Sequence, residues 1–457
     1  MERLIVVSVD AHAQMPPELW PEYLESRYHD LLPGLHEEQE LYAFVMQLVF
    51  DRAYPDLSVF DRDGVYEAGN WSGLYDRDVR LAEMDREGIA GEFVNNGDGR
   101  LVALFFEAGN RVQSADVCRA GVRAYHRWLT DTLGGHPDRC FLIGALGSGP
   151  CGELDPVLHE LDWIADHGYV ATSIPGKTAY PGQLPLSDPS WEPFWAKCAE
   201  RGLHLWIHAG QGQQQGSLSR EVDSAYAQFD SVGRDVDKFW EILVTGVFNG
   251  ELFDLPTPRQ AMWQLMFSGV FDRHPDLKLM MNEVRGDWVP ATLQLLDQVW
   301  ATHRDDLSAR RPPSEYWATN CQAGLSFVHK AEIAHRHEIG VETMSFGRDY
   351  PHSEGTWPNT VDWLADAFAG VPDDELRLIL GGNAIRMFDL DHDRLAEIAT
   401  RIGPTVEQLS SDREIDRRLV DHFAARGGYL KPFEGGRRIR EIDALVQGDL
   451  ARTRITG

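Results

Sequence analysis

Cysteine is scarce in this chain, and its spacing excludes the structures that cysteines usually form. The five cysteines are scattered over 457 residues with no Cys-x-x-Cys pair: Cys118, Cys140, Cys151, Cys198 and Cys321. This pattern favours neither a disulfide framework nor a thiolate zinc site. We therefore expect a protein of the reducing cytoplasm.

Positive charge is also in short supply. The 43 Lys and Arg residues stand against 72 Asp and Glu residues, which gives a net charge of −29. Such an acidic chain would be repelled by nucleic acid and by an anionic membrane. We expect a small-molecule substrate instead, and an anionic substrate would need local cations.

Long apolar runs are missing as well. No run approaches the roughly 18 residues that span a bilayer, and the N-terminus has no basic segment followed by an apolar core. We therefore expect neither a membrane span nor a secretion signal. The chain does contain 43% apolar residues, which is enough for a substantial core.

Short apolar runs alternate with helical patterns along most of the chain. Eight runs are predicted to be strands: Leu4–Val9, Gly88–Asn95, Cys140–Leu146, Gly168–Ile174, Leu203–His208, Leu277–Glu283, Thr319–Phe327 and Val341–Gly347. Helical spacing separates them, for example over residues 76–86 and 155–166. Eight strands alternating with helices predict an α/β fold, the (β/α)8 TIM barrel.

Two regions depart from this alternation. Residues 21–75 have few periodic elements and are too long for an ordinary loop, so we expect a lid-like insertion after the first strand, or a packing excursion. Residues 391–457 are charge-rich with helical spacing, and we expect a C-terminal extension that wraps the barrel or joins a dimer. The predicted domains are thus a barrel over residues 1–390 and a helical extension over residues 391–457.

Metal-binding side chains follow four of the predicted strands. In strand order they are Asp10 and His12, then His208, then Glu283, then Asp349 and His352. The carboxyl ends of barrel strands converge, so these side chains should lie close together. Oxygen and nitrogen donors without a thiolate suit Zn²⁺ or Mn²⁺. Each residue alone also has a simpler explanation; His208, for example, could be a buried core histidine.

Several motifs carry a family resemblance. They are Ser8–His12, Pro16–Trp20, Ile207–Gly210, Phe271–Leu279, Gly286–Pro290, Phe346–His352 and Gly382–Ala384. Together they resemble the amidohydrolase-2 branch of the amidohydrolase superfamily, which includes aminocarboxymuconate-semialdehyde decarboxylase and related metal-dependent decarboxylases and hydrolases. The resemblance implies one divalent ion, Zn²⁺ first with Mn²⁺ or Fe²⁺ as alternatives, held by Asp10, His12, His208 and Asp349.

The chain departs from the family pattern at four places, one of which is Met15, where many relatives place a Glu. The first strand ends in Asp10-x-His12 where the decarboxylases often carry His-x-His or Glu-x-His. Glu283 stands where they carry a catalytic His; it is expected to act as a general base or proton donor, or else to pair with Arg285. Arg348 replaces a small residue, and two roles stay open for it: binding a substrate carboxylate or forming a structural salt bridge.

The expected activity is non-oxidative decarboxylation of an unsaturated or aromatic carboxylic acid. A divalent ion can also lower the pKa of bound water from 15.7 to about 7, so hydrolysis of an amide, ester, lactone or C–C bond is the alternative. A second alternative is an inactive homologue with a binding or structural role. Catalytic roles are predicted for Asp349, Glu283, His352 and Arg348, and substrate contacts for Arg285, Trp206 and Tyr350. The resemblance also implies a homodimer or higher homo-oligomer.

Overall fold

Eight parallel strand positions form a barrel, as the sequence predicts. The first position is split into two short strands, and the strands are β1 (Val7–Ser8), β2 (His12–Ala13), β3 (Gly91–Asn96), β4 (Cys140–Gly144), β5 (Ala171–Ser173), β6 (His204–His208), β7 (Leu279–Asn282), β8 (Cys321–Ser326) and β9 (Met344–Gly347). They pair in chain order from β1 to β9, with β2 also against β3. All of these pairings are parallel, as in the predicted fold.

Backbone hydrogen bonds between the first and last strand positions bring the two edges of the sheet together. The Val9 amide donates to the Phe346 carbonyl at 2.8 Å, and the Asp349 amide donates to the Asp10 carbonyl at 3.0 Å. A parallel bridge between Ala11 and Tyr350 continues this contact. The two ends of the predicted metal motif, near residues 10 and 349, are therefore neighbours across the closing seam.

This computed structural model describes residues 3–34, 36, 40, 44, 56–96, 114–146, 153–175, 184–209, 229, 231–243, 257–352, 354–409, 414–424 and 438–455. Cys151 and Gly210, which belong to patterns noted above, lie outside the described residues. The four described cysteines are buried free thiols.

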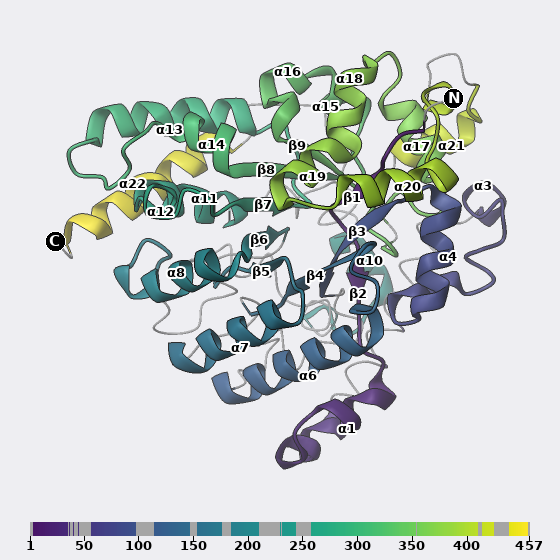
Figure 1. Cartoon of the computed structure of the whole chain (residues 1–457), viewed down its shortest axis with the longest axis horizontal. Helices are drawn as coiled ribbons and strands as arrows, with labels where there is room; N and C mark the ends of the chain where they lie inside the picture. The colour runs from purple at the N-terminus through teal and green to yellow at the C-terminus, as the bar shows by residue number, and fades with distance from the viewer. Residues whose placement is uncertain are drawn as a thin grey trace.

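Helices fill the connections between strands and surround the barrel (Figure 1). Those between successive strand positions are α1 (Trp20–Tyr23), α3 (Leu57–Phe60), α4 (Arg77–Glu87), α6 (Ala115–Leu133), α7 (Leu154–Asp166), α8 (Glu192–Arg201), α10 (Val236–Leu243), α11 (Thr257–Phe267), α12 (Val270–Arg273), α13 (Val289–His303), α14 (Pro313–Asn320), α15 (Lys330–Ala334) and α16 (Arg336–Ile339). After β9 come α17 (Thr360–Ala367), α18 (Asp373–Arg377), α19 (Asn383–Phe388), α20 (His392–Ile402), α21 (Arg417–Ala424) and α22 (Ile439–Ile455).

Local sequence explains where these helices begin and end, and α4 is a clear case. The side chain of Asp76 accepts hydrogen bonds from the amides of Asp78 and Val79 at 2.9 and 3.1 Å, which caps the first turn. Gly88 follows the last turn with φ of 75°, a left-handed conformation that glycine adopts without a Cβ clash. The sequence predicted a helix over 76–86, and the structure places it one residue later.

The barrel interior is packed with apolar side chains below the strand ends. Val9, Phe93, Trp206 and Met280 belong to one buried cluster. Phe388 of α19 packs against Phe93, with ring centroids 4.5 Å apart. The interior is thus a filled core, and the candidate metal-binding side chains lie where the strands end.

The insertion and the C-terminal extension are partly described. Among the described residues of 21–75 the chain forms the end of α1, α3 and the 3-10 helices η2 (Ser26–Leu31) and η3 (Asn70–Leu74). After residue 390 it forms α20, α21 and α22 together with the 3-10 helix η9 (Val406–Leu409). A lid role for the insertion and a dimer role for the extension stay predictions. None of the described helices combines the length and apolar character needed to cross a membrane.

Candidate metal centre

Four predicted ligands meet at the carboxyl ends of the strands. They come from the first, fifth and eighth strand positions and form what we call the four-donor cluster, Asp10, His12, His208 and Asp349. His12 joins two groups of close donors within it, one with Asp10 and His208 and the other with Asp349 and His352. His12 Nε2 lies 3.4 Å from Asp10 Oδ1 and 3.1 Å from Asp349 Oδ1. His208 Nε2 lies 3.4 Å from the same Asp10 oxygen. The structure therefore brings these residues close together, and their role as metal ligands stays a prediction.

The arrangement of the donor atoms in this cluster suits the binding of a metal ion better than hydrogen bonding between the donors. Asp10 Oδ1, His12 Nε2 and both carboxylate oxygens of Asp349 are buried and make no hydrogen bond to any part of the chain that is described. Donors held about 2.0–2.2 Å from one ion lie about 3–3.5 Å apart, which matches the distances above. Donor atoms that converge at these distances suit a divalent ion.

The second nitrogen of each histidine ring is held by a backbone carbonyl. His12 Nδ1 lies 2.8 Å from the Asn96 carbonyl oxygen, and His208 Nδ1 lies 3.1 Å from the Ala209 carbonyl oxygen. His208 Nδ1 is also 3.2 Å from Glu283 Oε2. A proton on Nδ1 leaves Nε2 as a lone-pair donor toward the cluster, which is the tautomer a metal requires.

Two strand ends reach the site through a left-handed backbone. Glu283, directly after β7, has φ of 53°, and Asp349, after β9, has φ of 56°. Non-glycine residues pay about 1–3 kcal/mol for such conformations, which cluster at functional sites. We take this local strain as a further sign that the two carboxylates are placed for a ligand.

Burial and the neighbouring groups of the cluster shift the pKa values of Asp10, His12 and Glu283. Burial alone would raise the pKa of Asp10, but the imidazoles of His208 and His12 outweigh it and hold that pKa well below its usual range. Burial would lower the pKa of His12, yet the carboxylates of Asp10 and Asp349 raise it well above its usual value. Burial, with Asp349 and Asp10 nearby, raises the pKa of Glu283. A divalent ion would compete with these protons.

The side chain of Arg348 pairs with Glu92 and not with the four-donor cluster, which bears on its two predicted roles. Its side chain is fully buried, and Nε and Nη2 donate to Glu92 Oε2 at 2.9 and 2.6 Å. The other oxygen of Glu92 accepts from Arg80, which also donates to the His12 carbonyl. These contacts support the structural salt bridge, and the predicted catalytic role of Arg348 stays a prediction.

Two of the predicted substrate contacts are likewise packed into the interior. Trp206 is fully buried and stacks on Phe93 with ring centroids 5.4 Å apart, because its position in β6 faces the barrel core. Tyr350 is fully buried, donates to the Asn70 carbonyl, and lies under the Arg348 guanidinium at 4.4 Å. Neither ring is exposed to a substrate in this arrangement. Arg285 Nη2 lies 3.2 Å from Asp287 Oδ2, and its substrate role stays a prediction.

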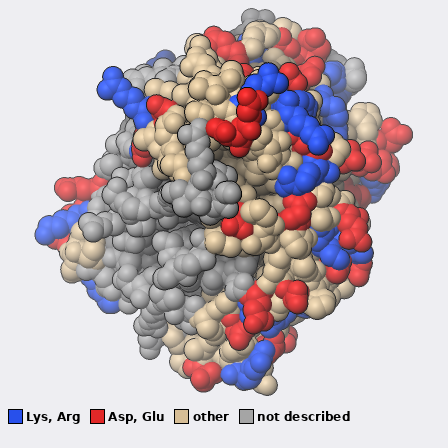
Figure 2. All heavy atoms as spheres, turned by 90° about the vertical axis from the view of Figure 1, so that its left-hand side faces the viewer, with Lys and Arg blue, Asp and Glu red and all other residues tan. Residues whose placement is uncertain are grey.

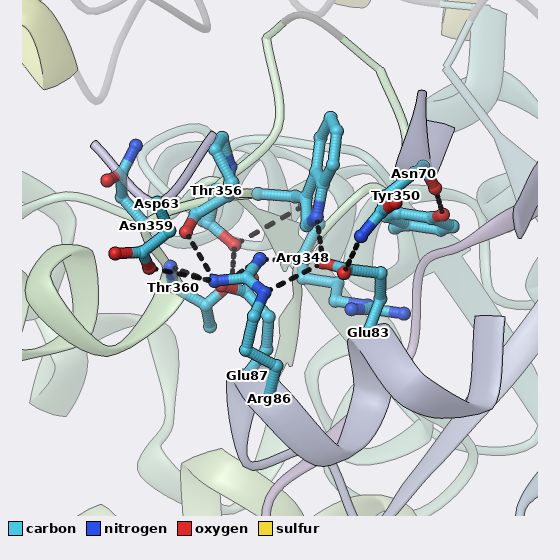
Figure 3. Close-up of polar contacts among 12 residues, drawn as sticks. Asp63, Asn70, Glu83, Arg86, Glu87, Arg348, Tyr350, Thr356, Asn359 and Thr360 are labelled. Carbon is cyan, nitrogen blue, oxygen red and sulfur yellow. Dashed lines mark hydrogen bonds and ion pairs between the residues drawn. The ribbon is translucent and has the colours of Figure 1, made fainter. Parts of the chain in front are cut away.

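The loop after β9, which carries Asp349 and His352, is anchored by buried polar contacts (Figure 3). The Thr356 amide donates to the Arg348 carbonyl at 2.9 Å, which closes the loop on itself. Trp357 Nε1 donates to Glu83 of α4 at 2.7 Å, and Thr360 donates to Glu87 of the same helix. These contacts hold the end of the loop against α4.

Sequence reasoning missed three residues that surround the cluster. Ser326, at the end of β8, donates to Asp10 Oδ2, and the strand-end rule could have found it. Asn96 contributes a backbone carbonyl, for which side-chain patterns give no signal. Glu354 joins Glu283, Asp349 and His352 in a group whose donor atoms all lie within 4.8 Å of one another. Because Glu354 follows the predicted site residue His352 by two positions, the sequence could have indicated that it lies near the site.

A parallel barrel with nitrogen and oxygen donors at its strand ends defines a metal-dependent barrel enzyme. The chain belongs to the amidohydrolase family, because the family model described as Amidohydrolase matches residues 9–390. This confirms the resemblance noted from the motifs.

Among curated relatives, a gamma-resorcylate decarboxylase from Rhodococcus jostii (strain RHA1) is 25% identical over 348 residues, covering 72% of this chain and 94% of that protein. A gamma-resorcylate decarboxylase from Rhizobium sp. (strain MTP-10005) is 25% identical over 346 residues, with the same shares covered.

Solved structures share the fold. The 2,6-dihydroxybenzoate decarboxylase from Rhizobium has a TM-score of 0.55 and 20% identity, and the match covers 86% of this chain and 100% of that one. A dihydroxybenzoic acid decarboxylase from Polaromonas sp. JS666, with bound manganese and the inhibitor 2-nitroresorcinol, has a TM-score of 0.54 and 18% identity over 86% of this chain and 99% of that one.

Proposed function

We propose that this protein is a metal-dependent decarboxylase that releases CO₂ non-oxidatively from an aromatic or unsaturated carboxylic acid. The observation that carries the proposal is the four-donor cluster, whose lone pairs face one another at ligand-to-ligand distances. The decarboxylase relatives supply the reaction class. Two imidazoles and two carboxylates suit Mn²⁺ or Zn²⁺, and the manganese in a structural neighbour makes Mn²⁺ the first ion to test.

The proposed roles of the residues follow from their contacts. When bound, a divalent ion would polarise a substrate oxygen next to the carboxylate. Asn96 and Ala209 hold the rings of His12 and His208 so that Nε2 faces the ion. In the reaction the bond from carbon to the carboxyl group breaks, CO₂ leaves, and the electron pair left on carbon takes a proton. We assign delivery of that proton to Asp349, whose carboxyl group faces the cluster.

The proposal is tested by metal content and CO₂ release on the same preparation. Protein purified from manganese-supplemented medium is analysed by mass spectrometry and incubated with 2,6-dihydroxybenzoate and related aromatic acids. We expect at least one ion per chain and release of CO₂. His208→Ala should lose the ion and the activity, whereas His392→Ala, with a side chain that is 65% exposed, should lose neither.

Asp349→Asn separates the two roles of Asp349. A neutral amide can still present an oxygen to the ion but cannot deliver a proton at neutral pH, so the CO₂ release rate should fall at least a hundredfold while part of the metal is retained. Metal-free wild-type protein, or hydrolysis of an ester, amide or lactone without any CO₂ release, would contradict the proposal.

A further inference from the structure

Two carboxamide side chains at the strand ends are buried without a hydrogen-bond partner. Gln14 follows β2, and Asn282 is the last residue of β7. Both residues are fully buried. Neither the oxygen nor the nitrogen of either carboxamide is hydrogen-bonded in the part of the chain that the structure describes. Such groups are costly for the folded state, because they have given up their hydrogen bonds to water.

The other buried asparagine and glutamine side chains among the described residues each have a partner. Gln264 of α11, for example, accepts from the Leu186 amide at 3.0 Å and donates to Asp449 at 3.1 Å. Asn383 of α19 donates to the Met344 carbonyl at 2.7 Å. Native folds leave few buried polar groups unpaired, and each such group calls for an explanation. The two unpaired carboxamides therefore point to a ligand.

Asn282 faces the barrel interior at the level of the candidate metal ligands. Met280, two positions earlier in β7, lies in the buried cluster of the barrel interior, and alternate residues of a strand face the same side. In the pairing of β6 with β7, the register partner of Asn282 is His208, whose side chain belongs to the four-donor cluster. A Cβ at Gly324 would lie 2.3 Å from Asn282 Oδ1, so this glycine leaves the space that the carboxamide fills.

Gln14 lies on the same side of its strand as His12, but farther along. Its neighbours Ala13 and Met15 belong to the hydrophobic cluster that includes helix residues such as Trp128 of α6. Alternation along the strand therefore directs Gln14 away from the helices, to the side of His12. Two residues of a parallel strand span about 6.6 Å, so Gln14 lies beyond the four-donor cluster in the direction of the strand ends.

We infer that Asn282 and Gln14 bind the substrate, and that this substrate is an aromatic acid with an oxygen substituent away from its carboxyl group. The inference rests on the proposed decarboxylation. Asn282, level with His208, hydrogen-bonds substrate oxygens at the candidate metal centre. Gln14 hydrogen-bonds the distant substituent, since a carboxamide offers both a donor and an acceptor to a hydroxyl group. A substrate without that substituent would leave Gln14 buried and unpaired.

Kinetics with matched aromatic acids test the inference. CO₂ release is measured with 2-hydroxybenzoate and with 2,4- and 2,5-dihydroxybenzoate, which keep the 2-hydroxyl and add a distant one. For the better dihydroxy acid, kcat/KM of the wild type should exceed that for 2-hydroxybenzoate by about a hundredfold or more. Gln14→Leu should reduce this ratio by about tenfold or more, and Asn282→Leu should raise KM for every acid by about tenfold.

The melting temperature distinguishes substrate binding from a structural role. Replacing an unpaired buried carboxamide by leucine removes no hydrogen bond, so the Tm of substrate-free Gln14→Leu and Asn282→Leu should equal or exceed that of the wild type at constant metal. Gln264→Leu is the matched control, because its carboxamide is paired. Its Tm should fall by about 2 °C or more, with the wild-type kcat/KM ratio.

Three results would overturn the inference and leave the proposed decarboxylation intact. They are a wild-type kcat/KM ratio in Gln14→Leu, a wild-type KM in Asn282→Leu, and a loss of Tm or of folding in these variants as large as in Gln264→Leu. A wild type that releases CO₂ from none of these acids, nor from 2,6-dihydroxybenzoate, would overturn the proposed function and the inference together.

Discussion

At the scale of single residues, Glu92, Arg80 and Arg348 form a buried ion-pair triad next to residues of the candidate metal centre. Glu92 receives Arg348 on one oxygen and Arg80 on the other, and all three side chains are fully buried. Arg80 also holds the His12 carbonyl, and Arg348 precedes Asp349 in the chain. Buried charged side chains of this kind destabilise the fold when one of them is removed, because the remaining charge is left buried and uncompensated.

Arg348→Ala should therefore reduce the free energy of unfolding by about 3–5 kcal/mol, as measured by urea denaturation. Arg417→Ala is the control, because that arginine pairs with Asp421 on the surface with its side chain 83% exposed; a loss of about 0.5 kcal/mol or less is expected there. If Arg348→Ala kept the wild-type stability and changed only the KM for a carboxylate substrate, the substrate-binding role would be restored.

At the scale of elements, α22 shows how the C-terminal extension attaches to the barrel. Its apolar residues Ile442, Val446 and Leu450 recur every four positions and are buried. Asp449 of the same helix accepts hydrogen bonds from Trp263 Nε1 at 2.9 Å and Gln264 Nε2 at 3.1 Å in α11. The apolar stripe buries hydrophobic side chains against the barrel. The hydrogen bonds to the aspartate fix the position of α22 along α11.

We predict that Asp449→Ala lowers the free energy of unfolding by about 3 kcal/mol, because buried donors of α11 lose their acceptor. The helix should also become accessible to limited proteolysis. Asp443→Ala changes the same helix but, among the contacts of the described residues, removes an acceptor for Gln447, and it should cost about 0.5 kcal/mol or less. Equal effects of the two substitutions would mean that Asp449 contributes no more than a surface residue.

At the scale of the whole molecule, the net charge of −29 opposes the compact state. On the face shown in Figure 2, acidic side chains lie among basic and uncharged ones, so the repulsion there does not arise from one acidic patch. Salt shortens the reach of this repulsion, since the Debye length falls from about 30 Å at 0.01 M to about 8 Å at 0.15 M.

Raising NaCl from 0.01 to 0.15 M at neutral pH and constant metal should therefore raise the Tm by about 2 °C or more, as followed by differential scanning calorimetry. The increase should shrink near pH 5, because the isoelectric point of the sequence is about 4.9 and the net charge there is close to zero. A Tm that is insensitive to salt at neutral pH would show that repulsion between the negative charges contributes little to the stability of the folded state.

The order of the strands and the residues at their ends were readable from the sequence. A buried strand needs a nearly continuous apolar run, and a polar residue is tolerated only where that run ends. This rule located Asp10, His208 and Asp349, and the parallel alternation then predicted that they converge. These inferences depend on local pattern and on one general property of barrels, so they need no knowledge of tertiary contacts.

The partners of the charged residues were decided by the tertiary structure alone. A sequence cannot tell whether Arg348 faces the site or the core, because both directions are open to a residue after a strand end; the buried Glu92, 256 positions away, decides it. The same ambiguity applies to Trp206, since an aromatic ring in a strand suits the core and the site equally, and the structure places it in the core. Side-chain direction and long-range pairing follow from packing, which is determined only when all eight strands are in place.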